Sequence, residues 1–146
     1  MARMVDVGGK QDIKRRAVAT GEIVLRRATL KAIMVGNLEK GDALGTAEVA
    51  ALQAVKKVWE VLPHAHPIPI TAAKVDLKVG KSSVRATVAV EATYKTGVEM
   101  EVLYGVLVAL LTVWDMVKPL EKDEGGQYPL TKIRDVHVMS KVKGDG

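Results

Sequence analysis

Asp115 and Lys118 stand three positions apart in a segment whose neighbouring residues are mostly apolar. On a helix this spacing places a carboxylate and an ammonium group on one face, close enough to pair. An ordinary surface ion pair, which stabilises a helix by about 0.2–0.5 kcal/mol, is the commoner explanation. Because Trp114, Met116 and Val117 flank the pair, we expect part of this turn to be buried. A partly buried pair is a candidate for chemistry.

Two further carboxylates, Glu99 and Glu101, lie where the same apolar segment begins. The positive end of a helix dipole favours carboxylates, and this explains both without any function. A functional role requires that at least one of them faces a cavity. The residue pattern leaves these two explanations open.

His64 and His66 lie in the loop Pro63–Pro69, where prolines forbid regular helix. Two histidines with no nearby carboxylate make a poor zinc site, and His137 is far along the chain. We therefore expect no metal site. A loop histidine that offers a hydrogen bond or a proton to a ligand is a better interpretation, because its charge changes near neutral pH. Plain surface histidines are the alternative.

The charge balance favours an anionic partner. The chain carries a net charge of +5 and has a pI near 9.5. Lys40-Gly41-Asp42 precedes an expected helix N-terminus, which suits phosphate, although it lacks the spacing of a Walker motif. Lys14-Arg15-Arg16 and Arg26-Arg27 are typical of solvated faces. With aromatic residues at only 3%, stacking on single-stranded nucleic acid is disfavoured, so a polyphosphate fits best.

Composition sets further limits. The chain of 146 residues has the size of a single domain, and we expect one domain over residues 1–146. It contains no cysteine, which excludes a cysteine nucleophile and a thiolate metal site and suits a reducing cytosol. The most apolar run, Val102 to Trp114, is too short to cross a membrane and is typical of a buried helix. We expect a soluble, cytoplasmic protein.

The periodicity of apolar residues predicts the elements that must position these side chains. Residues 1–16 are expected to form a loosely ordered arm, followed by a strand over Ala17–Leu25 and a short helix over Ala28–Val35 that ends at Gly36-Asn37. Asp42 can cap a helix over Ala43–Val61, with Val49, Leu52, Val55, Val58 and Trp59 along one face.

The second half of the chain predicts a hairpin, a helix and a last strand. Ile70–Val79 and Val84–Thr93 alternate and are joined by Gly80-Lys81-Ser82. The strongest helical segment runs over Val98–Val117 and is expected to end before Pro119. A polar loop, a strand over Ile133–Val142 and a free tail from Gly144 follow. This β-α-β-β-α-β order predicts an α+β, ferredoxin-like fold with helices on one face of an antiparallel sheet.

Several segments in order resemble the cyclic pyranopterin monophosphate synthase family (molybdenum cofactor biosynthesis protein C). They span roughly Met4 to Lys122. They include Met4-Val5-Asp6-Val7, Lys40-Gly41-Asp42, Gln53 to Trp59, Pro63 to Pro67, Lys95-Thr96-Gly97-Val98-Glu99-Met100-Glu101 and Trp114-Asp115-Met116-Val117-Lys118. Two departures stand out: Ala65 replaces a cysteine that many relatives have, and Gln127–Lys143 replaces a Gly/Ser/Lys-rich end.

The resemblance implies a lyase that converts 3′,8-cyclo-7,8-dihydroguanosine 5′-triphosphate to cyclic pyranopterin monophosphate and releases diphosphate. It implies a homohexamer, a trimer of dimers, with sites at a dimer interface. No cofactor is expected to be required, although Mg²⁺ can accompany the triphosphate or diphosphate. The catalytic pair corresponds to Asp115 and Lys118. The substrate-binding candidates are Arg15, Lys40, Lys56, His64, His66, Glu99, Met100 and Glu101.

The chemistry agrees with these residue types. Lys40, Lys56 and Arg15 can neutralise a triphosphate and its leaving group. A buried Asp115–Lys118 pair, with pKa values shifted toward neutrality, could transfer the protons that the ring rearrangement needs.

Two other interpretations remain. The first is an RNA-binding ferredoxin-like domain, which predicts paired aromatics on its sheet. The second is an assembly subunit whose long helix is only an interface, which leaves the Glu99, Glu101, Asp115 and Lys118 pattern unexplained.

Overall fold

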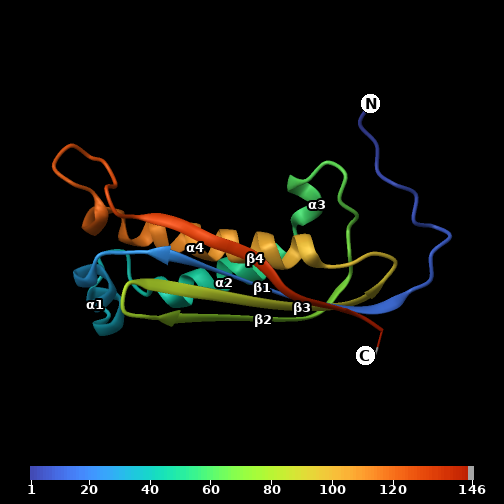
Figure 1. Cartoon of the computed structure of the whole chain (residues 1–146), viewed down its shortest axis with the longest axis horizontal. Coiled ribbons are helices and arrows are strands. Elements are labelled where there is room, and N and C mark those ends of the chain that lie inside the picture. Colours follow the sequence, from blue (N-terminus) through green and yellow to red (C-terminus); the bar gives the residue numbers. More distant parts are fainter. Residues whose placement is uncertain (145–146) are drawn as a thin grey trace.

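Four long strands form one antiparallel sheet in the computed structural model, which describes residues 1–144 (Figure 1). The sheet order is β2-β3-β1-β4, so β1 lies in the middle between β3 and β4. The elements are β1 (Ile13–Val24), α1 (Arg27–Val35), α2 (Ala43–Val55), α3 (Val58–Val61), β2 (Ile70–Val79), β3 (Ser83–Tyr94), α4 (Glu99–Glu121) and β4 (Lys132–Lys143). This order and topology confirm the predicted α+β, ferredoxin-like fold.

Most predicted boundaries agree with the structure to within a residue or two. The hairpin strand Ile70–Val79 is as predicted, and β4 extends one residue beyond the expected strand at each end. Helix α1 ends at Gly36, whose φ of 72° is left-handed and whose N–H donates to the carbonyls of Ala32 and Ile33. A glycine adopts this conformation without a steric penalty, so the predicted helix stop is confirmed.

The N-terminal arm is shorter than predicted. Residues 1–12 have no helix or strand and run as an extended segment past one end of the sheet (Figure 1). Strand β1 begins at Ile13, so Arg15 belongs to the sheet, where it pairs with Ala92. Its guanidinium donates to the carbonyls of Tyr94 and Lys95 at 3.4 and 3.3 Å. Arg15 is 9% exposed, so it is part of the ordered sheet and not of a loose arm.

The core lies between the sheet and the helices α2 and α4, and two glycines allow close approach there (Figure 1). A Cβ at Gly21 would lie 2.9 Å from Val106 and 2.8 Å from Val136. One at Gly105 would lie 2.8 Å from Val55. Gly21, which interrupts the apolar pattern of β1, is thus the point where α4 crosses the sheet.

The second helix differs from its prediction in length and in its buried face. The chain leaves helical geometry at Lys57 (φ −125°, ψ 16°), which separates α2 from the single turn of α3. The face of α2 toward α4 and the sheet is made of small residues, Ala43, Ala47, Ala51 and Ala54, with Val55. Small side chains let two helices approach closely, so Val49 and Leu52 face outward instead and are exposed.

Helix α4 continues past its predicted end, through Pro119 to Glu121. Among residues 1–144 it is the one helix long and apolar enough to cross a membrane by composition, and half of its most apolar window is buried in the protein. Its packing on the sheet matches the expected core helix.

At the C-terminal end of the described chain, Gly144 N–H donates to the carbonyl of Lys14 at 2.8 Å. The rest of the predicted tail, 145–146, lies outside the described residues.

Candidate active site

At the C-terminal end of α4, three side chains form a charged cluster. The Asp115 carboxylate lies 3.2 Å from Lys118 Nζ on the same helix. It also lies 3.3 Å from Lys40 Nζ, which the loop between α1 and α2 supplies. Lys40 additionally donates to the backbone carbonyl of Asp115 at 3.1 Å. The chain thus places two ammonium groups on one carboxylate, and this arrangement can bind phosphate oxygens if the lysines turn outward.

Part of this turn is buried as predicted, since Met116 and Val117 are buried, but the Asp115–Lys118 pair itself is not buried in a single chain. The Asp115 side chain is 57% exposed and that of Lys118 is 42% exposed. Trp114 is only partly buried and packs edge-on against Tyr128, with the ring centres 5.1 Å apart. Hydrogen bonds from Lys118 and Lys40 lower the pKa of Asp115. In one chain Asp115 is therefore an ionised acceptor, not a group poised near neutrality.

At the N-terminal end of α4, a small cavity of about 160 Å³ contains four of the predicted substrate-binding residues. Its lining includes His64, His66, Met100 and Glu101, from the proline-braced loop and the first turn of α4. His66 Nε2 lies 2.8 Å from the carbonyl of Val5 in the N-terminal arm. A carbonyl only accepts, so this nitrogen carries the proton.

Glu101 faces this cavity and is 4% exposed. Burial raises its pKa to about 7; a backbone hydrogen bond opposes this rise and the charge of Glu99 adds to it. A favourable interaction with the α4 helix dipole would not by itself explain why Glu101 is buried beside a cavity. A carboxyl with a pKa near neutral can accept or donate a proton at physiological pH.

Glu99 lies in the same turn and has the opposite shift. Its burial alone would raise its pKa, but a hydrogen bond from Lys141, a backbone hydrogen bond, and the charges of Lys141 and Arg15 outweigh this and lower it. The distance from Lys141 Nζ to the Glu99 carboxylate is 2.7 Å. Arg15, Glu99 and Glu101 therefore belong to one group at this end of α4.

Lys141 was missed by the sequence analysis. It lies opposite Ala17 in the β1–β4 ladder, and Ala17 is buried, so Lys141 projects from the side of the sheet that α4 covers. Alternation of side chains along β4 would predict this side of the sheet for Lys141 only if the register between β1 and β4 were regular. Shifts between Val18 and Ala19 and between Thr20 and Glu22 hide that register in the sequence.

The structure does not bring all the predicted residues together in one chain. Glu101 and Asp115 are 14 positions apart on α4, which corresponds to about 21 Å. Lys56 is the C-terminal cap of α2, at the opposite end of that helix from Lys40. Because Val55 contacts Gly105, Lys56 lies nearer the Glu101 end. Two groups result, one around Asp115 with Lys40 and Lys118 and one around Glu101.

A buried carboxylate fixes the turn that follows Lys118. Glu121 is fully buried and accepts hydrogen bonds from the hydroxyls of Thr29 and Thr131 and, at 3.1 Å, from the backbone N–H of Arg26. It therefore joins the first turn of α1 and the start of β4 to the last turn of α4. The loop of residues 37–40, which follows α1, lines a cavity of about 390 Å³ together with Met116, Pro119 and Leu120 of α4.

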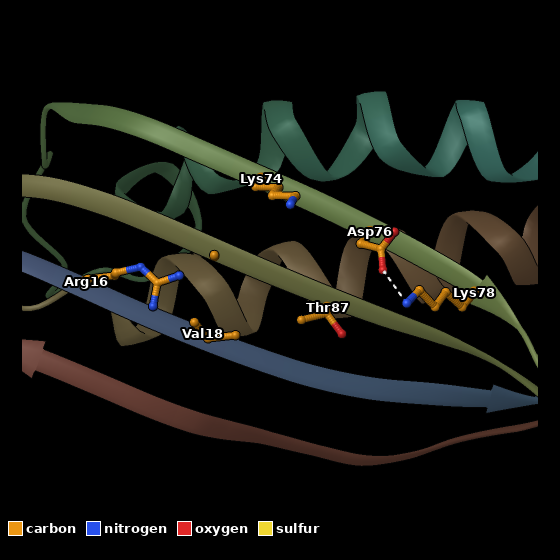
Figure 2. Close-up of a pocket in the computed structure, with 7 residues that line it drawn as sticks. Arg16, Val18, Lys74, Asp76, Lys78 and Thr87 are labelled. Atoms are coloured by element: carbon orange, nitrogen blue, oxygen red, sulfur yellow. Dashed lines mark ion pairs between the residues drawn. The ribbon is translucent and has the colours of Figure 1, made fainter.

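The face of the sheet away from the helices has a different character. A shallow cavity of about 400 Å³ lies there. Side chains from β1, β2 and β3 surround it (Figure 2). It is lined by Arg16, Val18, Lys74, Asp76, Lys78, Thr87 and Ala89. None of these residues is aromatic, so the stacking platform that an RNA-binding sheet needs is missing from this cavity. Its charges are partly paired, as in Lys78–Asp76 at 3.9 Å.

Residues 1–144 contain no group of three or more His, Asp or Glu side chains that could hold a metal ion. His64 and His66 line the small cavity at the start of α4. His137 lies on β4, where its Nδ1 is 2.7 Å from the carbonyl of Asp135.

Comparison with known proteins agrees with the resemblance of the motifs. A protein from Thermococcus onnurineus (strain NA1) is 51% identical over 144 residues, which cover 99% of this chain and 92% of the relative. One from Methanosarcina acetivorans is 57% identical over 143 residues, covering 98% and 90%. Both are named as probable cyclic pyranopterin monophosphate synthases. The MoaC family model matches residues 4–144, and the chain belongs to the MoaC family.

Proposed function

We propose that this chain is a lyase of molybdenum cofactor biosynthesis that converts 3′,8-cyclo-7,8-dihydroguanosine 5′-triphosphate to cyclic pyranopterin monophosphate and diphosphate. The observation that carries the proposal is membership of the MoaC family along residues 4–144, with relatives of that printed activity at 51–57% identity. The two polar groups at the ends of α4 supply the chemistry that this reaction needs.

The group around Asp115 acts on the phosphates and on proton transfer. Closing the cyclic phosphate requires that a sugar hydroxyl attacks the α-phosphorus while diphosphate leaves. Lys40 and Lys118 stabilise the negative charge that develops on the phosphate oxygens. Asp115, which these lysines keep ionised, accepts a proton once the substrate draws the lysines toward its phosphates. Asp115 and Lys118 are the catalytic pair in this proposal.

The group around Glu101 binds the base and the ribose. His64, His66, Met100 and Glu101 line one cavity, and burial raises the pKa of Glu101 to about 7. Glu101 can therefore hydrogen-bond to the substrate in either protonation state. Glu99, whose carboxylate lies beside Gly97 in the cavity lining, forms a charged group with Arg15 and Lys141, and Lys56 at the end of α2 adds a further cation in this proposal.

A complete site needs two copies of the chain. Catalytic groups must lie within about 3 Å of the atoms they act on, and the two groups are separated by about 21 Å along one helix. We therefore propose that the Asp115 group of one protomer faces the Glu101 group of another, in a homohexamer built as a trimer of dimers. The exposed apolar side chains of α2 and α4 support this arrangement, since a partner can cover them. They include Val49, Leu52, Leu107 and Leu111.

The proposed enzyme is soluble and cytoplasmic. It holds no resident metal in this proposal, and Mg²⁺ would be carried by the triphosphate or the diphosphate. The direct test is to supply the cyclised nucleotide to the purified chain. Stoichiometric diphosphate and a pterin-like fluorescent product are expected. Unchanged substrate, under conditions where a family member turns it over, would refute the function.

A further inference from the structure

Pro119 lies inside α4, one turn after Asp115. In an α-helix the N–H of each residue donates to the carbonyl four positions earlier, which for position 119 is that of Asp115. Proline has no N–H, and its ring crowds that carbonyl and tilts it away from the helix axis. The Asp115 carbonyl therefore lacks its helical partner and points outward.

Lys40 takes the place of this missing partner. Its Nζ lies 3.1 Å from the Asp115 carbonyl oxygen and 3.3 Å from each carboxylate oxygen. An ammonium has three protons to donate, so one lysine can bond to the main chain and the side chain of the same residue. Lys118 contacts the carboxylate from the helix itself. The carbonyl is thus a fixed anchor for Lys40, independent of the carboxylate.

We propose that Pro119 is a positioning residue of the active site: by freeing the Asp115 carbonyl, it holds Lys40 against Asp115 before substrate binds. This inference rests on the proposed function, in which Lys40 contacts the phosphates. A lysine side chain is long and flexible, and ordering it in advance lowers the entropy that substrate binding must otherwise lose. When phosphate arrives, Lys40 turns from the carboxylate while it is already at the site.

The surrounding structure tolerates the proline. A proline in a helix interior is destabilising, but the turn after Pro119 is closed by Lys122 N–H, which donates to the carbonyl of Lys118 at 3.1 Å. The buried Glu121 network then ties this turn to α1.

The test is Pro119→Ala, which restores the N–H. Stability and function should change in opposite directions. We expect Tm to rise by about 2 °C or more, because a helix-breaking residue is removed. We expect kcat/KM for the cyclised nucleotide to fall roughly three- to tenfold, mostly through a higher KM, because one charge-assisted anchor of Lys40 is weakened.

A titration of the Asp115 carboxyl by 13C NMR gives a readout that does not depend on turnover. The pKa of Asp115 should rise in Pro119→Ala. Its value in Lys40→Ala, where the contact with Lys40 is lost completely, sets the upper limit of this rise. Pro129→Ala makes the same chemical change in the loop after α4 and should change neither the Asp115 pKa nor kcat/KM.

The proposal is overturned if Pro119→Ala keeps the wild-type pKa of Asp115, keeps wild-type kcat/KM, or melts at a lower temperature. If the wild-type chain itself does not turn over the nucleotide, the proposed function fails, while the carboxyl titration still decides whether Pro119 anchors Lys40.

Discussion

The two ends of α4 hold carboxyl groups in opposite electrostatic states. At the start of the helix, Glu101 is buried beside a cavity and burial raises its pKa to about 7. At the other end, Asp115 is exposed and two lysines lower its pKa. Burial favours the neutral form of a carboxyl and paired cations favour the charged form, so one helix presents a carboxyl with a pKa near neutral at its start and an ionised carboxylate between two ammonium groups at its end.

The largest effect is expected at the exposed end. Lys118→Ala should reduce kcat by roughly a hundredfold or more, because it removes a group that acts in the transition state. The side chain is partly exposed, so Tm should change little. Turnover of the cyclised nucleotide measures the loss, with Lys122→Ala, one turn further on, as the control. Full turnover by Lys118→Ala would remove the exposed end from the catalytic site.

The exposed end depends on a buried carboxylate, and its removal should cause the next largest effect. Glu121→Ala leaves the hydroxyls of Thr29 and Thr131 and the Arg26 N–H without their acceptor. The free energy of unfolding should fall by about 3 kcal/mol or more. Urea denaturation measures this, and Glu124→Ala, in the exposed loop, should stay within about 0.5 kcal/mol of wild type. Equal losses in both variants would contradict the network's role.

The enclosed end should control how stability depends on pH. Glu101 has a pKa of about 7 in the folded chain against an ordinary value of 4.5, so between these values the folded chain binds the proton more tightly than the unfolded chain. The free energy of unfolding should therefore fall as pH rises from 4.5 to 7, by up to about 3 kcal/mol, and level off above pH 7.

Two variants isolate this contribution. In Glu101→Gln, whose side chain cannot ionise, the free energy of unfolding should no longer fall between pH 5 and pH 8. Asp115→Asn should keep the wild-type fall between these two pH values, because a carboxyl whose pKa is lowered from 3.8 titrates below pH 5. If the free energy of unfolding of Glu101→Gln still falls as much as that of the wild type, the pH dependence belongs to another group.

The smallest effect is expected at Lys141, whose side chain is 69% exposed. Lys141→Ala should raise the pKa of Glu99, because the hydrogen bond and charge that lower it are removed. KM should rise by up to about fivefold with little change in kcat, as a surface ion pair contributes about 1 kcal/mol at most. Lys143→Ala, two positions further along β4, is the matched control. If Lys141→Ala lost as much kcat as Lys118→Ala, Lys141 would take part in the reaction itself.

The alternation and helical spacing of apolar residues predicted the fold because each strand buries one face. They failed where packing overrides propensity. The buried face of α2 is made of alanines because α4 comes close there, which no rule about large apolar residues indicates. Pro119 predicts a helix end, yet α4 continues because Lys40 satisfies the freed carbonyl and Glu121 holds the next turn.

For the candidate site, the residue types and motifs named the side chains but not their surroundings. The burial of Glu101 and the exposure of Asp115 depend on which neighbours cover each end of α4. The pairing of Lys141 with Glu99 depends on the bulged register of β4. These long-range contacts leave no local signal, so the sequence predicted a buried Asp115 and missed Lys141.

We propose that the two ends of α4 from different protomers complete one site. A subunit-mixing experiment tests this: Lys118→Ala and Glu101→Gln chains, each impaired alone, are dissociated and reassembled together. If each site combines two protomers, half of the dimers are mixed and one of their two sites is intact. Activity should then recover to about a quarter of wild type. No single chain in the mixture carries both Lys118 and Glu101, so any recovery requires a site built from two chains. Activity no higher than that of the separate variants would contradict a shared site.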